Sequence, residues 1–294
     1  MRPPAWASFF EAAHWGHFLS LVADDLRGRG LGPTVDGDGG VVRLADGRCF
    51  GLSNLAQMCH RERWDRWPAL IAHHFGVALR ATGAADTGPL DFEPSRASCK
   101  LRLWRREALP SPNACHWEIA DDLVAALTLD LPDLLMTVNE QDAASWPIAR
   151  ADLWNLALAN LRADGLLEAP AFDIEGARLH VLEGDRSFFA ASHVLFLEDY
   201  VGPSPHGCVV AMPRRHTLLW SRIVDLQVVA VIPSMLDLTQ RMSHEGPGSI
   251  SPFLYWWRPG LQLLRLPSQI VGTTVEFHPP EPFLRMLNGL PRRA

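Results

Sequence analysis

A chain of 294 residues with 48% hydrophobic and 20% charged residues has the composition of a globular protein, and its length suits one large domain or two ordinary ones. The net charge of -6 argues against broad electrostatic attraction to nucleic acid or to anionic lipid, so we expect neither as a partner. No run of about 18 uncharged apolar residues occurs, and we expect no membrane-spanning helix.

The first 82 residues predict an N-terminal subdomain made of a helix, a hairpin region and further helices. Apolar residues recur at helical spacing in the first helix, and Asp-Gly dipeptides are typical of turns between short strands. The expected elements are a helix over 5–27, strands within 33–50 with turns at 38–39 and 46–47, and helices over 53–59 and 68–80.

Residues 83–96 are rich in Gly, Pro, Ala and Asp, which predicts a linker or long loop before a C-terminal domain over 97–294. In that domain helical and strand patterns alternate irregularly, and many strands are spaced as hairpins. This favours an α+β fold with mixed, mostly antiparallel sheets. We expect strands over 98–105, within 123–139, and over 177–182, 207–212, 253–257, 261–266 and 271–277, and helices over 142–163, 187–201, 217–240 and 282–290.

A basic strand is predicted in the segment SCKLRLWRR over 98–106. Alternate residues of a strand share a face, so Lys100, Arg102 and Trp104 should point the same way. Such a face could bind phosphate, carboxylate or a nucleic-acid backbone. The alternative is a solvated face on which arginine stems cover Trp104. Lys100 is the only lysine, so Schiff-base chemistry would depend on it alone.

A second basic cluster ends the segment GCVVAMPRRH over 207–216. A buried strand followed by proline would project Arg214, Arg215 and His216 at its carboxyl end, where the next predicted helix begins. Two guanidiniums at a helix start suit a small anion. The alternative is that the arginines form ordinary ion pairs. Their candidate partners are Glu198, Asp199 and Asp225.

Two histidines on the first predicted helix, His14 and His17, have a spacing that metal ligands also use. Further ligands would have to come from the pairs at 73–74 or 59–60. The simpler interpretation is that both histidines pack at the apolar face of their helix. The sequence has no HExxH, GxxxxGK[ST] or GxSxG motif, and we predict neither a metal nor another cofactor.

The chain contains 11 tryptophans, and the cluster of Trp64 and Trp67 with Arg63 is a candidate interaction surface. Such residues can line a groove for a peptide or protein, although core packing explains many of them. Our leading hypothesis is a non-enzymatic interaction or adaptor protein with a tryptophan-lined groove. The alternative is an enzyme or sensor that binds a small anionic ligand through the Arg-Arg-His cluster.

Five cysteines lie at wide spacings with no CxxC motif, which favours reduced thiols over a disulfide framework. The first residues lack the apolar segment of a secretory signal. These features predict a cytoplasmic protein.

Four segments resemble the YtpQ-like family of bacterial proteins, which is defined by a domain of unknown function. They are an apolar strand with Asp130 near Pro132, ADLWNLALANL over 151–161, GCVVAMPRRH over 207–216 and SISPFLYW over 249–256. The resemblance covers residues 120–258 and departs from the family's pattern after Arg214, where an acidic residue is expected. It implies a soluble bacterial α+β protein and no particular activity.

Overall fold

The chain divides into two compact units in the computed structural model. Unit 1 comprises Met1–Leu90 and Leu131–Leu135, and unit 2 comprises Asp91–Asp130 and Met136–Ala294. The division after Leu90 falls inside the predicted linker, of which residues 86–89 lie outside the described part. The structure describes residues 2–4, 7–38, 40–45, 48–85, 90–131, 134–174, 176–184, 187–245, 248–271 and 274–291.

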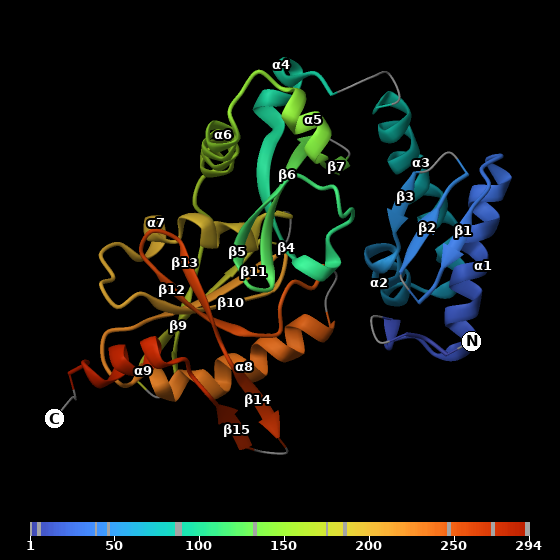
Figure 1. The fold of residues 1–294 in the computed structure, drawn as a ribbon. Helices are drawn as coiled ribbons and strands as arrows, with labels where there is room; N and C mark the ends of the chain where they lie inside the picture. The colour runs from blue at the N-terminus through green and yellow to red at the C-terminus, as the bar shows by residue number, and fades with distance from the viewer. Residues whose placement is uncertain are drawn as a thin grey trace. The chain divides into compact units, whose positions relative to one another are not determined.

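Unit 1 joins helices to a small antiparallel sheet in the order β1-β2-β3 (Figure 1). Helical spacing of apolar residues explains α1, because Trp15, Phe18 and Val22 fall on one buried face. That face packs with Leu55 and Phe75 of later helices. The predicted turns include Gly39 and residues 46–47, which lie outside the described part. The elements are α1 (Ala12–Gly28), β1 (Thr34–Asp36), β2 (Val41–Arg43), β3 (Cys49–Gly51), α2 (Ser53–Arg61), η2 (Trp64–Arg66) and α3 (Trp67–Ala85).

From Asp91 onward the chain forms antiparallel sheets with helices packed on them, so the expected α+β class is confirmed (Figure 1). One sheet has the order β4-β6-β5, with β7 paired to β6, and a second has the order β13-β12-β10-β11-β9-β8. The elements are α4 (Phe92–Ser95), η3 (Arg96–Ser98), β4 (Cys99–Arg105), η4 (Arg106–Ala108), β5 (His116–Ala120), β6 (Leu123–Leu131), β7 (Leu134–Thr137), α5 (Glu140–Ser145), α6 (Arg150–Ala163), β8 (Ala171–Ile174), β9 (Ala177–Glu183), η5 (Ala190–Phe196), α7 (Glu198–Val201), β10 (Cys208–Arg214), β11 (Thr217–Arg222), α8 (Val228–Glu245), β12 (Leu254–Arg258), β13 (Gln262–Leu266), β14 (Ser268–Val271), β15 (Thr274–Phe277) and α9 (Glu281–Asn288).

The central strands β10 and β11 of the six-stranded sheet are buried on both faces along most of their length. Val209 and Leu219 point to one side, where they share a core with Met235 of α8 and with α9 (Figure 1). Val210 and Leu218 point to the other side and are also fully buried. There η5 contacts β11. β10 is apolar at successive positions because it is a central strand, and the side chains on both of its faces are buried.

The predicted helix over 217–240 is wrong in its first part. Thr217–Arg222 forms β11, which pairs with β10 and β9, and the helix α8 begins at Val228. A strand buried on both faces has no alternation of polar and apolar residues, so its sequence resembles a buried helix. Pro213 does not end β10 but lies within it, at an irregular register between Ala211 and Arg214, where a missing N–H is tolerated.

The predicted helix over 187–201 and the predicted single strand over 271–277 also differ from the structure. The first segment contains η5, a 3-10 helix, and then the short helix α7. The second region is a hairpin of β14 and β15. Among the described residues no helix is long and apolar enough to cross a membrane.

Gly207, immediately before β10, is required by both its conformation and its surroundings. Its φ is +75°, and a Cβ at this position would lie 2.0 Å from the carbonyl oxygen of Trp257. We expect Gly207→Ala to lower the free energy of unfolding by roughly 2–5 kcal/mol, because left-handed strain adds to a main-chain collision. Urea unfolding followed by circular dichroism measures this loss.

Gly202→Ala is the matched control. Gly202 has a φ of +59° and a ψ of -153°, a region that glycine alone adopts readily, but no neighbouring atom within 4 Å of a Cβ. Only conformational strain of about 1–3 kcal/mol is therefore expected. Equal losses for the two variants would contradict the role of the Trp257 carbonyl.

Candidate functional site

The guanidinium of Arg102 is buried and has no carboxylate partner among the described residues. It lies on the face of β4 that also carries Lys100 and Trp104, and the residue is 7% exposed. Its carbon Cζ lies 4.2 Å from the centre of a Trp104 ring. Its Nε has no hydrogen-bond partner in the described part of the chain, so this buried donor lacks an acceptor there.

A second arginine, Arg215, is 9% exposed in the turn between β10 and β11. Its Nε donates to Nε2 of His216 at 2.9 Å, and its Cζ lies 4.5 Å from the centre of the Phe188 ring. Nδ1 of His216 faces the carbonyl oxygens of Gly184 and Ser187 at 3.3 and 2.9 Å. We therefore assign the ring proton to Nδ1, which leaves Nε2 to accept from Arg215.

The protonation state of His216 agrees with this tautomer. Burial, and then the charge of Arg215, lower the pKa of His216 below its ordinary value, so the ring is neutral at pH 7. A neutral ring can hold Arg215 without adding a third positive charge. His216 thus orients one guanidinium of the cluster.

Gly248 lies against the stem of Arg215. A Cβ at Gly248 would lie 2.5 Å from Cδ of Arg215, and the N–H of Arg215 donates to the Gly248 carbonyl at 2.9 Å. The φ of Gly248 is +74°, which L side chains rarely adopt. Glycine therefore gives the arginine side chain its space.

The positive charge of Arg215 acts on Arg102. Burial, and then the positive charge of Arg215, lower the pKa of Arg102 to about 9. The group remains protonated at pH 7, because that value is still above neutral. A buried charge costs several kcal/mol unless an acceptor neutralises it, so Arg102 is the residue of this cluster at which an anion would have the largest effect.

The segment η5 brings the two arginines together although they are distant in sequence. Its Ser192 hydroxyl accepts from the N–H of Leu103 in β4 at 3.1 Å. Its Ala191 N–H donates to the carbonyl of Arg215 at 3.0 Å. Neighbouring residues of η5 thus bind the strand that carries Arg102 and the turn that carries Arg215.

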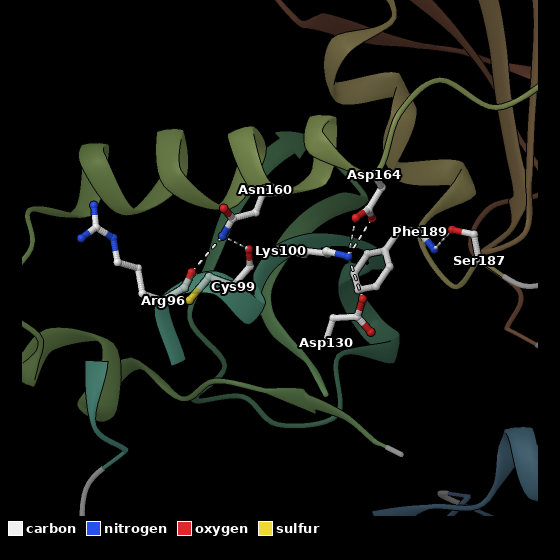
Figure 2. Close-up of polar contacts among 8 residues, drawn as sticks. All are labelled: Arg96, Cys99, Lys100, Asp130, Asn160, Asp164, Ser187 and Phe189. Atoms are coloured by element: carbon white, nitrogen blue, oxygen red, sulfur yellow. Dashed lines mark hydrogen bonds and ion pairs between the residues drawn. The ribbon is translucent and has the colours of Figure 1, made fainter. Parts of the chain in front are cut away.

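Lys100 lies in a separate cluster, in which two carboxylates neutralise it (Figure 2). Its Nζ lies 2.7 Å from Oδ2 of Asp130 and 2.7 Å from Oδ2 of Asp164. Burial opposes the charge, but hydrogen bonds to these carboxylates outweigh it and raise the pKa of Lys100. The structure thus does not bring Lys100 into one site with Arg102, although both lie on the same face of β4.

Asn160 of α6 holds the start of the same strand (Figure 2). Its Nδ2 donates to the carbonyl oxygens of Arg96 and Cys99, each at 2.9 Å. These bonds fix β4 against α6 and so help to set the position of the strand's basic face.

Arg214 forms an ordinary ion pair. Its Nη2 donates to Oε1 of Glu183 at 2.8 Å, and its Nε donates to the hydroxyl of Thr217 at 3.0 Å. The alternative of ion pairing therefore describes Arg214, with a partner outside the three acids named from the sequence. Arg215 and His216 form the part of the triplet that lies near Arg102.

The interaction cluster of unit 1 is divided between surface and core. Trp67 is 3% exposed and packs in the core, whereas Trp64 is 63% exposed. Arg63 is also exposed and pairs with Asp65 at 3.3 Å. Among the tryptophans of the described residues, Trp64 is the one with a largely exposed side chain.

The histidines of α1 contact this cluster. The rings of His14 and His17 each lie 6.0 Å from that of Trp67. No group of three or more His, Cys, Asp or Glu side chains in the described residues is placed to hold a metal ion.

The described thiols are buried. Cys59, Cys99, Cys115 and Cys208 are unpaired, and burial raises the pKa of Cys59 to about 12 and that of Cys99 to about 11. Thiols with such values stay protonated near pH 7.

Sequence reasoning missed Ser192 and Phe188 as parts of the site. A serine within the apolar run of η5 was the available signal, because a buried hydroxyl needs a hydrogen-bond partner. Nothing in the sequence around Phe188 marks its contact with Arg215.

No protein-family model, curated protein or solved structure matches the chain. The resemblance to the YtpQ-like family therefore stays a prediction, and function has to be argued from the chemistry of the site.

Removing the positive charge of Lys100 or of Arg102, which share a face of β4, should have opposite effects on the free energy of unfolding. Lys100→Met should lower the free energy of unfolding by about 1–2 kcal/mol, because two partly exposed carboxylates lose their partner. Arg102→Met should leave it unchanged or raise it by up to about 2 kcal/mol, because it removes an unpaired buried charge. Urea unfolding in a buffer of chloride alone measures both.

The comparison contains its own control, because both variants lose one charge and gain the same side chain. A loss for Arg102→Met as large as that for Lys100→Met would show that Arg102 is already neutralised within the protein.

Proposed function

We propose that this protein binds a small oxyanion, with phosphate as the best-matched class, between Arg102 and Arg215. The observation that carries the proposal is the buried, charged guanidinium of Arg102, whose Nε has no hydrogen-bond partner among the described residues. A guanidinium is a planar fork of N–H donors whose geometry matches two oxygens of a phosphate or carboxylate. A bound oxyanion would supply the acceptors that Arg102 lacks.

The preference for phosphate follows from the number of acceptor oxygens. The Nε of Arg102 has no partner among the described residues, and the guanidinium of Arg215 is held in place by Nε2 of His216. A phosphate group offers three oxygens to guanidinium donors, whereas a carboxylate offers two. Inorganic phosphate and a phosphate ester share this chemistry.

The preference for a small ligand follows from access. Only 7% of the surface of Arg102 and 9% of the surface of Arg215 is exposed to solvent. An extended polyanion contacts exposed cations along a surface, and the net charge of -6 opposes its approach. The proposed ligand is therefore a compact anion or the phosphate end of a small molecule.

The hypothesis of a tryptophan-lined groove has less support. Of its named residues, Trp64 is exposed while Trp67 lies in the core. A protein or peptide partner remains a separate prediction, which Trp64 and Arg63 would serve. We favour the anion site because a buried charge without a partner requires an explanation, whereas a single exposed tryptophan does not.

Phosphate should stabilise the protein through Arg102. Binding to the folded state raises its stability in proportion to the logarithm of ligand concentration, and each kcal/mol raises the Tm of a chain of this size by roughly 2–4 °C. We expect about 10 mM phosphate to raise the Tm of the natural protein and leave that of Arg102→Met unchanged. Differential scanning calorimetry at constant ionic strength measures both.

Lys100→Met is the matched control and should keep the phosphate shift, since Lys100 is occupied by Asp130 and Asp164. Arg102→Lys should bind more weakly than the natural protein, because an ammonium lacks the fork. An equal phosphate shift in Arg102→Met, or no shift in the natural protein with phosphate or phenyl phosphate, would refute the site.

A further inference from the structure

A second region of unit 2 forms a cavity of about 440 Å³ at one end of the six-stranded sheet. It is lined by β9, β11, α7 and the segment that leads into α8. Its volume lies within the range of small-molecule sites, about 300–1,000 Å³. The residues that give it chemistry are Arg178, His180, Tyr200, Trp220, Arg222 and Gln227.

Three aromatic rings form one wall of this cavity. His180 and Trp220 are cross-strand neighbours in β9 and β11, and their rings lie parallel, 5.0 Å apart with an interplanar angle of 1°. The ring of Tyr200 lies 5.4 Å from that of Trp220, tilted by 60°. A wall of this kind offers flat apolar surface to a planar ring.

Two arginines add positive charge beside these rings. Burial lowers the pKa of His180, and the charges of Arg178 and Arg222 lower it further, against the hydrogen bond to the Ala169 carbonyl. Both arginines also line the cavity together with His180. Neither forms an ion pair with a carboxylate in the described residues.

The remaining polar groups of the cavity do not cancel this charge. Asp225 is 8% exposed, and its Oδ1 accepts from the N–H of Gln227 at 2.9 Å. Nη2 of Arg222 donates to the carbonyl of Pro203 at 2.7 Å, which uses one of its five N–H donors. Among the described residues, the lining thus has two cations to one acid, with guanidinium donors left over.

We infer that this cavity binds a small aromatic carboxylate. Its ring would lie along the wall of His180, Tyr200 and Trp220, and its carboxylate would meet Arg178 and Arg222. A guanidinium can bind a carboxylate through two parallel hydrogen bonds, and the rings give area for a planar hydrocarbon. This inference does not depend on the anion site at Arg102, which involves other strands and side chains.

Isothermal titration calorimetry of the full chain tests the inference with three probes. Naphthoate carries both the ring and the charge, naphthamide has the ring without the charge, and acetate has the charge without the ring. We expect naphthoate to bind at least about tenfold more tightly than either of the others. Equal binding of naphthamide, or no heat with about 10 mM naphthoate, would overturn the inference.

Amino-acid substitutions test whether naphthoate binds in the cavity. The double variant Arg178→Gln and Arg222→Gln should weaken naphthoate binding at least about tenfold. Its matched control is Arg241→Gln with Arg285→Gln, which removes the same charge from two exposed arginines of α8 and α9. Unchanged binding in the first double variant, or the same loss in the control, would overturn the assignment.

Arg102→Met separates this inference from the proposed function. It should abolish the phosphate shift and leave naphthoate binding unchanged. Loss of naphthoate binding in Arg102→Met would place the aromatic acid at the other site and overturn the inference, whereas absence of a phosphate shift with intact naphthoate binding would refute only the proposed function.

Discussion

The hydrogen bonds of η5 are the constraint on which the arrangement of the anion site depends. β4 is an edge strand in its sheet, and an edge leaves main-chain N–H groups that need acceptors. Ser192 supplies one acceptor to Leu103, and the adjacent Ala191 donates to the turn after β10. Two adjacent residues of η5 thus form hydrogen bonds with the edge strand of one sheet and with a turn of the other. As a consequence, the strand that carries Arg102 is joined to the turn that carries Arg215.

Neighbouring positions on β4 show how surroundings rather than residue type decide what a cation does. Lys100 and Arg102 share a face, yet the first pairs with Asp130 and Asp164 (Figure 2). The second has no carboxylate partner among the described residues, and the charge of Arg215 lowers its pKa. A neutralised cation contributes to packing and register, whereas a desolvated one without an acceptor makes folding less favourable. If the proposed anion binds at Arg102, binding capacity and stability oppose each other there.

The sequence was sufficient for the fold class and for most strands, but not for the tertiary contacts of the candidate site. Alternation in 98–106 correctly placed Lys100, Arg102 and Trp104 on one face, because strand periodicity is local. Local patterns also misassigned 217–222 as helix, because a strand buried on both faces loses its alternation. Hydrogen bonds through η5 join the strand of Arg102 to the turn of Arg215. The spacing of residues in the sequence does not predict these tertiary bonds. The cavity beside Trp220 escaped prediction for the same reason.

The contact between Gly248 and Arg215 has a consequence for how this sequence can vary over evolution. Gly248 carries no charge and no side chain, yet any side chain at this position would occupy the space of the Arg215 stem. Positions 215 and 248 are therefore expected to covary. As long as the arginine keeps its present orientation, position 248 has to be glycine. Any other residue at position 248 requires the arginine side chain to move.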